Sequence, residues 1–218
     1  MNARSTVIAI DGPAAAGKGT LARRIANHLG YAYLDTGLIY RAVGLKTLER
    51  GADPADAEAA TSAALALAPE DLKRPDLRGD EAANAASKVA AIPSVRAALL
   101  DFQRQFAASP PNGAPGAVLD GRDVGTVVCP DADRKLFVNA SLEVRAARRV
   151  KELRERGVEA IHTRVLKDMK ERDTRDSERD AAPLAPAENA LLIDTSTLNP
   201  DEVFNLALRL VSAGRSSD

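Results

Sequence analysis

The sequence predicts an α/β fold in which a five-stranded parallel β-sheet carries helices on both faces. Five short apolar runs recur along the 218 residues, and most are separated by segments whose apolar residues repeat with helical period. The runs are rich in Val, Ile and Leu without clean polar–apolar alternation, which is typical of strands buried on both faces. The expected strands are Thr6–Asp11, Tyr31–Asp35, Ala117–Asp120, Lys135–Asn139 and Ala190–Asp194.

The ends of these strands point to a ligand site. Four of the five runs end in aspartate, whereas the run that ends at Asn139 does not. Parallel strands end together, and open α/β sheets bind ligands at that carboxyl edge. Helical periodicity predicts helices over Gly19–Leu29, Leu142–Arg156 and Asp201–Val211.

Two stretches depart from simple alternation. Gly51–Pro115 is alanine-rich and contains no convincing strand, so we expect a helical insert there. Asp53-Pro54 predicts one helix start, as an N-cap followed by proline, and Pro93 predicts a second helix that runs to Ala108. The other stretch, Leu142–Asp180, is dense in charge, and Gly157 is the expected C-cap between two helices.

Composition excludes several classes of protein. Thirty Lys and Arg against 31 Asp and Glu give a net charge of −1, which argues against a general nucleic-acid coat protein. Aromatic residues are 3% of the chain, too few for a base-stacking platform. A single cysteine excludes an internal disulfide, and two histidines make a structural metal site unexpected. No run suggests a membrane span or signal peptide, so we expect a soluble cytoplasmic protein.

A phosphate-binding loop follows the first strand and opens the first helix. The spacing Gly-x-x-x-x-Gly-Lys is that of a P-loop, in which main-chain N–H groups and a helix N-terminus surround a phosphate and the lysine reaches the β- and γ-phosphates. The residues expected to bind ATP in this way are Gly12, Pro13, Ala14, Ala15, Ala16, Gly17, Lys18, Gly19 and Thr20.

The loop also bears on the metal. The position after the lysine, usually the Ser or Thr that ligates Mg²⁺, is Gly19, and the hydroxyl comes one place later at Thr20. We therefore expect no protein metal ligand, with Mg²⁺ held mainly by substrate phosphates and water. The chain lacks an Asn-Lys-x-Asp guanine motif and a Leu-Ser-Gly-Gly-Gln transporter signature, so the loop by itself leaves motor, switch and small kinase open.

Arginines supply the second charged feature. If residues 171–179 are helical, Arg172, Arg175 and Arg179 share one face, which fits a solvated helix or a bound polyanion. Arg122 follows a buried strand beside the expected phosphate loop, and guanidinium groups suit phosphate oxygens. An ATP site with arginines gathered near it suggests phosphorylation of a second anion.

The chain closely resembles the bacterial cytidylate kinases. Five motifs in order carry the resemblance: Gly12–Thr20, Asp-Thr-Gly-Leu-Ile-Tyr-Arg (35–41), Ala-Asn-Ala-Ala-Ser-Lys-Val-Ala (83–90), Asp-Gly-Arg-Asp-Val-Gly-Thr-Val-Val (120–128) and Glu-Arg-Asp-Thr-Arg-Asp (171–176). The resemblance implies the P-loop nucleoside monophosphate kinase fold. It implies one domain of three parts: a core (1–50, 116–141, 181–218), an insert that binds the monophosphate (51–115) and a lid (142–180).

The resemblance also implies roles. Lys18, Arg122, Arg172 and Arg179 are the expected catalytic residues. Arg41, Arg122 and Arg179 would contact the CMP phosphate or the group in transfer. Ser87, Arg96 and Asp123 would read the cytosine edge, with Asp120 helping to hold that cluster. Arg172 and Asp176 would contact the ribose. Thr36, where serine is common, and Tyr40 complete the substrate-binding set.

The implied activity is transfer of the γ-phosphate of ATP to CMP or dCMP by a monomer that binds neither nucleic-acid polymers nor membranes. A P-loop kinase for another acceptor, such as UMP or AMP, is the nearest alternative, and a nucleotide-gated binding module is a more distant one. The chain departs from longer members of the family between Leu67 and Glu81. They carry a small antiparallel sheet where this chain has only Ala68–Asp80.

Overall fold

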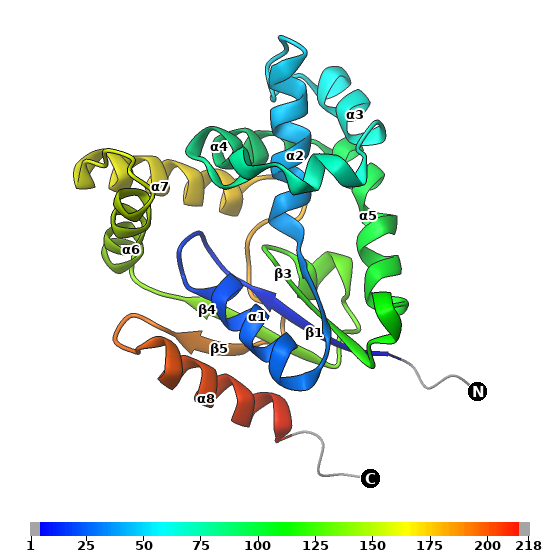
Figure 1. Ribbon diagram of the computed structural model, residues 1–218, viewed down its shortest axis with the longest axis vertical. Helices are drawn as coiled ribbons and strands as arrows, with labels where there is room; N and C mark the ends of the chain where they lie inside the picture. Colours follow the sequence, from blue (N-terminus) through cyan, green and yellow to red (C-terminus); the bar gives the residue numbers. More distant parts are fainter. Residues whose placement is uncertain (1–4, 214–218) are drawn as a thin grey trace.

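A computed structural model describes residues 5–213, whose strands form one parallel sheet in the order β2-β3-β1-β4-β5 (Figure 1). The strands are β1 (Thr6–Asp11), β2 (Ala32–Asp35), β3 (Gly116–Gly121), β4 (Arg134–Asn139) and β5 (Leu191–Asp194). The helices are α1 (Lys18–Leu29), α2 (Thr36–Glu49), α3 (Ala57–Leu65), α4 (Asp80–Val89), α5 (Pro93–Ala108), α6 (Leu142–Glu155), α7 (His162–Glu178) and α8 (Pro200–Ser212). The predicted fold class is confirmed, and each strand matches its predicted bounds to within one residue.

The central strand β1 is buried on both faces. Ile8 and Ile10 pack in an apolar layer with α1 and α8, whereas Val7 and Ala9 pack in the opposite layer, which includes part of α5. Successive side chains of a strand point to opposite faces, so β1 must be apolar at every inward position of both layers. This is why its sequence lacks polar–apolar alternation.

The insert is helical, as predicted, but its first helix does not start at Asp53-Pro54. α3 starts at Ala57, and the carboxylate of Asp56 caps it by accepting two main-chain N–H groups of the first turn. Asp53-Pro54 instead forms a turn, in which the Asp53 carbonyl accepts the Asp56 N–H at 2.8 Å. Because Ala60, Ala63 and Ala64 are the residues of α3 that reach the insert's apolar cluster, the later cap fits the packing.

Two short 3₁₀ turns, Pro69–Lys73 and Pro75–Arg78, occupy the shortened segment. A proline starts each of them, as its fixed φ favours at a first helical position. Leu77 anchors the second turn, because it is 1% exposed and packs with apolar residues of α2 and α4. The segment is therefore compact and joins the insert's core.

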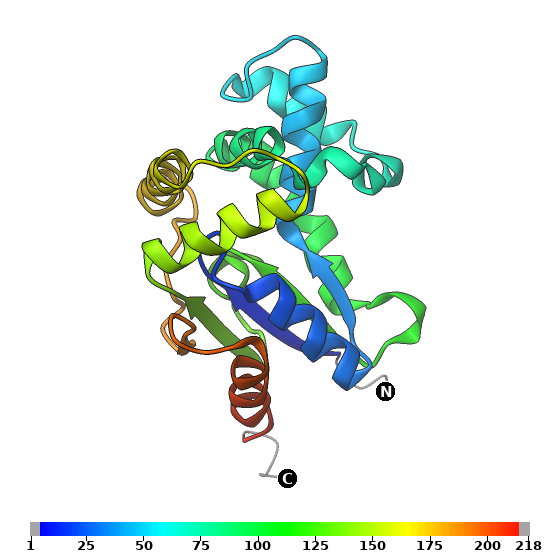
Figure 2. The same cartoon turned by 60° about the vertical axis from the view of Figure 1, so that its left-hand side comes forward.

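Helices α6 and α7 pack on each other around Val150, Leu153 and Met169. The C-cap of α6 is Arg156, one residue before the predicted Gly157, and Gly157 follows it with φ 76°, a conformation typical of the glycine that ends a helix. Figure 2 shows α6, in yellow-green, crossing above the sheet between the core and the insert. Among residues 5–213, no helix combines the length and apolar character of a membrane span.

Candidate active site

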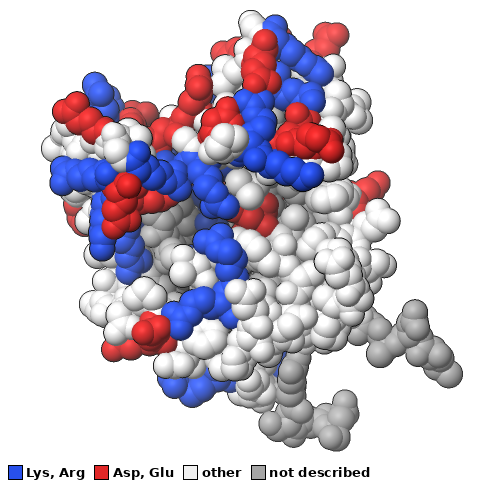
Figure 3. Space-filling model, in the orientation of Figure 1, with Lys and Arg blue, Asp and Glu red and all other residues white. Residues whose placement is uncertain are grey.

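A cavity of about 630 Å³ lies at the carboxyl edge of the sheet. Its walls come from the loop before α1, the ends of β2 and β3, the insert, helices α6 and α7, and the start of α8. Among the described residues, nine Lys and Arg but only five Asp and Glu line it. Basic side chains also gather around the hollow in Figure 3. In a chain whose net charge is −1, this local excess of positive charge favours a polyanionic ligand.

The phosphate loop connects β1 to α1. Gly17 has φ 93° and Gly12 has φ 147°, conformations that favour glycine. A Cβ on Gly12 would also lie 1.9 Å from the Val138 carbonyl oxygen. Residues 14–20 line the cavity, but Gly12 and Pro13 are not part of its wall. Gly12 and Pro13 are among the nine residues expected to bind ATP, but their place in the structure is to shape the loop.

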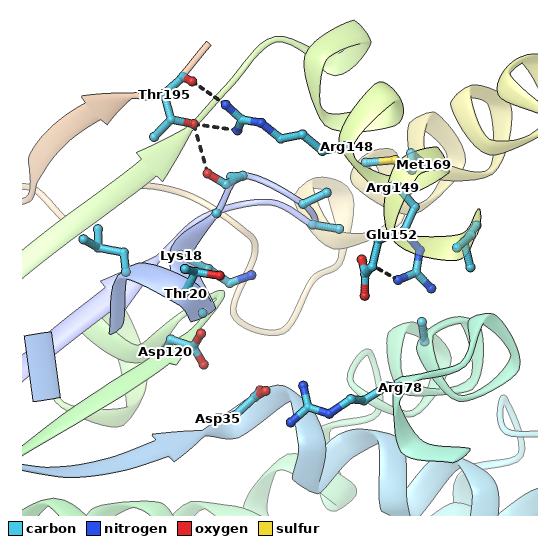
Figure 4. Close-up of a pocket in the computed structure, with 18 of the residues that line it drawn as sticks. Lys18, Thr20, Asp35, Arg78, Asp120, Arg148, Arg149, Glu152, Met169 and Thr195 are labelled. Carbon is cyan, nitrogen blue, oxygen red and sulfur yellow. Dashed lines mark hydrogen bonds and ion pairs between the residues drawn. The ribbon is translucent and has the colours of Figure 1, made fainter. Parts of the chain in front are cut away.

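Lys18 stands at the start of α1 and faces the carboxylates at the ends of two neighbouring strands (Figure 4). Asp35 and Asp120 are partners in the β2–β3 register. Burial, with Arg122 and Arg172 nearby, lowers the pKa of Lys18 to about 7. Burial, and repulsion from Asp35, raise the pKa of Asp120 to about 7. A polyphosphate in the cavity would favour the charged form of the lysine.

Proton uptake is therefore expected when ATP binds at pH 8. Free Lys18, with a pKa of about 7, is then mostly neutral, and the negative phosphates raise that pKa and draw a proton onto the amine. Titration calorimetry in buffers of different ionisation enthalpy measures the uptake. Lys18→Ala should abolish it. Equal uptake in wild type and variant would contradict the placement of Lys18 at the phosphates.

Asp120 lies at the end of β3, where the charges that act on it include those of Asp35, Lys18, Arg122 and Arg23. Strand register pairs it with Asp35 across β2–β3, whereas Asp123 lies beyond the strand end. That Asp120 helps to hold the cluster of Ser87, Arg96 and Asp123 stays a prediction.

A first buried cluster joins the lid to the core and the insert through Asp176 on α7. Its Oδ1 accepts the Ser87 hydroxyl at 2.8 Å, and its Oδ2 lies 3.1 Å from Arg122 Nε and 3.8 Å from Arg172 Nε. Arg175 Nε in turn donates to the Ser87 hydroxyl at 3.2 Å. Burial raises the pKa of Asp176, but the two neighbouring arginines outweigh it and the net pKa lies below its usual value.

A second buried cluster forms around Asp123. Its carboxylate pairs with Arg96, and its Oδ1 lies 3.5 Å from Arg179 Nη2. The guanidinium of Arg96 stands over the ring of Tyr40, 5.7 Å from its centroid. α7 ends at Glu178, so the predicted helix covers residues 171–178, and Arg179 is its C-cap. The Nε of Arg179 donates to the Ala182 carbonyl at 2.7 Å.

Two more of the expected substrate residues are held by main-chain carbonyls. The Thr36 hydroxyl, which is buried, donates to the Asp120 carbonyl at 2.8 Å. Arg41 lines the cavity, and its Nη1 donates to the Leu77 carbonyl at 3.0 Å. Both contacts fix the start of α2 relative to the sheet and the insert. Burial lowers the pKa of Arg41 from its ordinary value.

Two of the buried guanidinium nitrogens are incompletely satisfied. Among the described residues, Arg172 Nε and Arg179 Nη2 lie near carboxylates but have no hydrogen-bond partner. Burial, and the nearby Arg122, lower the pKa of Arg172 to about 9. A buried donor without a partner is costly, so these nitrogens are suited to an anion that would complete their bonds.

Sequence reasoning missed several residues that border the cavity (Figure 4). Arg148 donates to the hydroxyl and carbonyl of Thr195, and that hydroxyl donates to Ala16 in the phosphate loop at 3.0 Å. Arg149 pairs with Asp80 and so joins α6 to the insert. The dense charge of α6 hides these roles, because only the packing shows which arginines face the loop.

Three comparisons with known proteins show the family and the fold of the chain. The model of a family described as cytidylate kinase matches residues 8–213. The cytidylate kinase of Paramagnetospirillum magneticum is 64% identical over 97% of this chain and 100% of its own length, and that of Rhodospirillum rubrum is 58% identical over 94% and 97%. A solved structure, an uncharacterized protein from Eubacterium ventriosum, covers 95% of this chain and 99% of its own at 13% identity. Its TM-score of 0.55 speaks for the fold alone.

Proposed function

The chain belongs to the cytidylate kinase family, and from that premise we propose that it phosphorylates CMP and dCMP with ATP. The observation that carries the proposal within the structure is the convergence of Lys18, Arg122 and Arg172. Lys18 and Arg172 line the same cavity, and Arg122 and Arg172 lie 3.1 and 3.8 Å from the same Asp176 carboxylate oxygen. Such a site favours bound phosphates, which offset the repulsion.

The proposed reaction is an in-line transfer. A phosphate oxygen of CMP forms a bond to the γ-phosphorus of ATP, while the bond from that phosphorus to the β,γ-bridging oxygen breaks and ADP leaves. Lys18, Arg122, Arg172 and Arg179 spread the developing charge, since phosphoryl transfer depends mainly on positioning and charge neutralisation. The attacking oxygen is already anionic at pH 7, so no general base is required.

We assign substrate recognition to the two buried clusters. Cytosine presents an N4 donor beside the N3 and O2 acceptors, so the Asp123 carboxylate with the Arg96 guanidinium and Ser87 hydroxyl can match its edge. Tyr40 supports this set through its contact with Arg96. Arg41 and Thr36 would serve the CMP phosphate, and Arg172 and Asp176 the ribose. The Ser87–Asp176 hydrogen bond would give way when the base and ribose bind.

We propose that Mg²⁺ is bound mainly by the phosphates of the substrate and by water. Among the described residues, no three His, Cys, Asp or Glu side chains cluster as a metal site would require. The Asp35 and Asp120 carboxylates and the Thr20 hydroxyl line the cavity, which suits hydrogen bonds to water around an ion held by phosphates. Mg²⁺ bound there would neutralise charge on the β- and γ-phosphates.

We further propose that core, insert and lid act as separate parts of one domain, with the boundaries given above. The core and the lid are each built around an apolar cluster, and the insert packs on α2 in a third cluster that includes Ile39, Tyr40 and Val43. Closure of the lid would exclude water and limit wasteful ATP hydrolysis. The proposed enzyme is a cytoplasmic monomer that acts on free nucleotides.

An ADP-release assay with different acceptors tests the proposal. With ATP and Mg²⁺ present, CMP and dCMP should give rapid turnover, and UMP, AMP and shikimate much less. Lys18→Ala, prepared in the same way, controls for contaminating kinases. Faster turnover with AMP or UMP would shift the assignment to that acceptor. No ADP with any acceptor would favour a nucleotide-gated binding module.

A further inference from the structure

Asp11 is a buried carboxylate that is not among the proposed catalytic and substrate-binding residues, and it contacts the turn that directly follows Asp123. Asp11 ends β1, is 4% exposed, and accepts the main-chain N–H groups of Val124 at 2.8 Å and Gly125 at 2.7 Å. These two residues start a single π-helical turn, Val124–Val128, that follows β3. Asp11 thus ties the central strand to a turn far along the chain.

The same turn fixes the main chain of Asp123. The Asp123 carbonyl accepts the N–H groups of Val127 at 2.9 Å and Val128 at 3.2 Å. The N–H that follows it belongs to Val124 and donates to Asp11. The peptide after Asp123 is therefore held on both sides, which sets the direction in which this carboxylate leaves the chain toward Arg96.

Close packing leaves the turn little freedom to compensate for a lost bond. A Cβ on Gly121 would lie 2.5 Å from Thr36 Oγ1 and 2.8 Å from Val124 Cγ2. A Cβ on Gly125 would lie 3.2 Å from Lys135 Cδ and 3.3 Å from Asp11 Oδ2. A shift of the main chain at Gly121 or Gly125 would therefore bring it into collision with Thr36 of α2 or Lys135 of β4.

A charged group at this position is costly for the fold. Burial raises the pKa of Asp11 to about 6, the two main-chain hydrogen bonds oppose that rise, Asp123 adds to it and Lys18 opposes it. Lys135, from β4, packs against the same turn. Only an ionised carboxylate offers both oxygens as acceptors to the two N–H groups. The chain therefore retains a charge where an amide of the same shape would cost less to bury.

We propose that Asp11 is a positioning residue for base recognition: it fixes the turn that aims Asp123 and so sets the preference for cytosine over uracil without touching the substrate. The inference rests on the proposed function, in which Asp123 reads the cytosine edge.

Asp11→Asn tests the inference. The amide oxygen can accept one of the two N–H groups, but the NH₂ group opposes the other. We expect kcat/KM for CMP relative to UMP to fall about tenfold, with KM for ATP changed less than about twofold. Asp133→Asn is the matched control, because Asp133 accepts the Val7 N–H at 2.7 Å near the opposite end of β1. This control should keep the wild-type preference, and thermal unfolding verifies that both variants are folded.

The pH profile separates positioning from a general structural effect. As pH falls through about 6, Asp11 gains a proton and loses an acceptor, so the wild-type preference for CMP over UMP should weaken. The ratio of the two substrates cancels the titration of their phosphates. In Asp11→Asn the ratio should change less over the same range, since the amide does not titrate.

The outcomes distinguish this inference from the proposed function. If wild type prefers CMP and Asp11→Asn keeps both the preference and its pH profile, the positioning role is overturned while the kinase assignment stands. If wild type shows no preference for CMP, the proposed function itself fails. If Asp11→Asn does not fold, the wild-type profile decides, and a preference that stays constant from pH 7.5 to about 5.5 overturns the inference.

Discussion

Replacing Lys18 with alanine is expected to lower kcat by about three orders of magnitude while CMP still binds. The amine starts α1 within the phosphate loop, and it lies among Asp35, Asp120, Arg122 and Arg172. Its charge would be most needed as negative charge develops on the transferring phosphoryl group. The measurements are kcat from ADP release and the Kd of CMP from calorimetry.

Lys151→Ala is the matched control for this change. Lys151 lies on α6, is 80% exposed at its side chain, and pairs with Glu155 at 3.9 Å. We expect it to keep wild-type turnover. Circular dichroism verifies that Lys18→Ala is folded, because the substitution leaves two strand-end carboxylates without their lysine. Near-normal turnover in a folded Lys18→Ala protein would show that the phosphate loop is misassigned.

Asp123→Ala is expected to relax the choice of base by about 1–3 kcal/mol, or roughly 5- to 150-fold in the CMP-to-UMP ratio of kcat/KM. The variant loses the carboxylate proposed to accept the cytosine amino group and leaves Arg96 and Arg179 without their shared partner. Asp123→Asn keeps the volume and supplies an amide donor, so it should shift the choice toward the O4 acceptor of uracil. Kinetics with both nucleotides measures each shift.

Asp173→Asn provides the control for loss of a carboxylate that pairs with a buried arginine. Its Oδ2 lies 2.6 Å from Arg145 Nη2, within the lid and away from the Asp123 cluster. This variant should change lid stability and overall rate more than base choice. An unchanged CMP preference in Asp123→Ala would count against the assignment of Asp123 to the cytosine edge.

The sheet and the phosphate loop could be predicted from sequence because their signals are local. Strands such as Thr6–Asp11 are apolar on both faces, and the glycines of the loop occupy conformations that other residues rarely adopt. The helix start at Asp53-Pro54 could not be settled in this way. Asp53 and Asp56 are equally good caps, and only packing of the insert chooses the second.

The contacts within the charged clusters could not be predicted, because they depend on the three-dimensional packing and not on the spacing of residues in the sequence. Arg179 is the C-cap of α7, and helical spacing does not show that its Nη2 lies 3.5 Å from Asp123 Oδ1. Asp120 and Asp123 are three positions apart, yet they have different neighbours. Strand register places Asp120 beside Asp35, near Lys18, whereas the turn after β3 places Asp123 beside Arg96. Arg148 looks like any charge on a solvated helix until its bonds to Thr195 are seen.

The strand order has a consequence for the folding of the chain. Thr6 pairs with Gly116 and Ile8 with Arg134, so the first strand made has no neighbour until the strands that follow the insert are made. Contacts this distant in sequence slow folding, because loop closure precedes any gain from pairing. On the ribosome, the nascent amino-terminal segment must wait until the whole insert has emerged. Destabilising the insert should therefore lower the yield of refolded enzyme more than it lowers the activity of molecules that are already native.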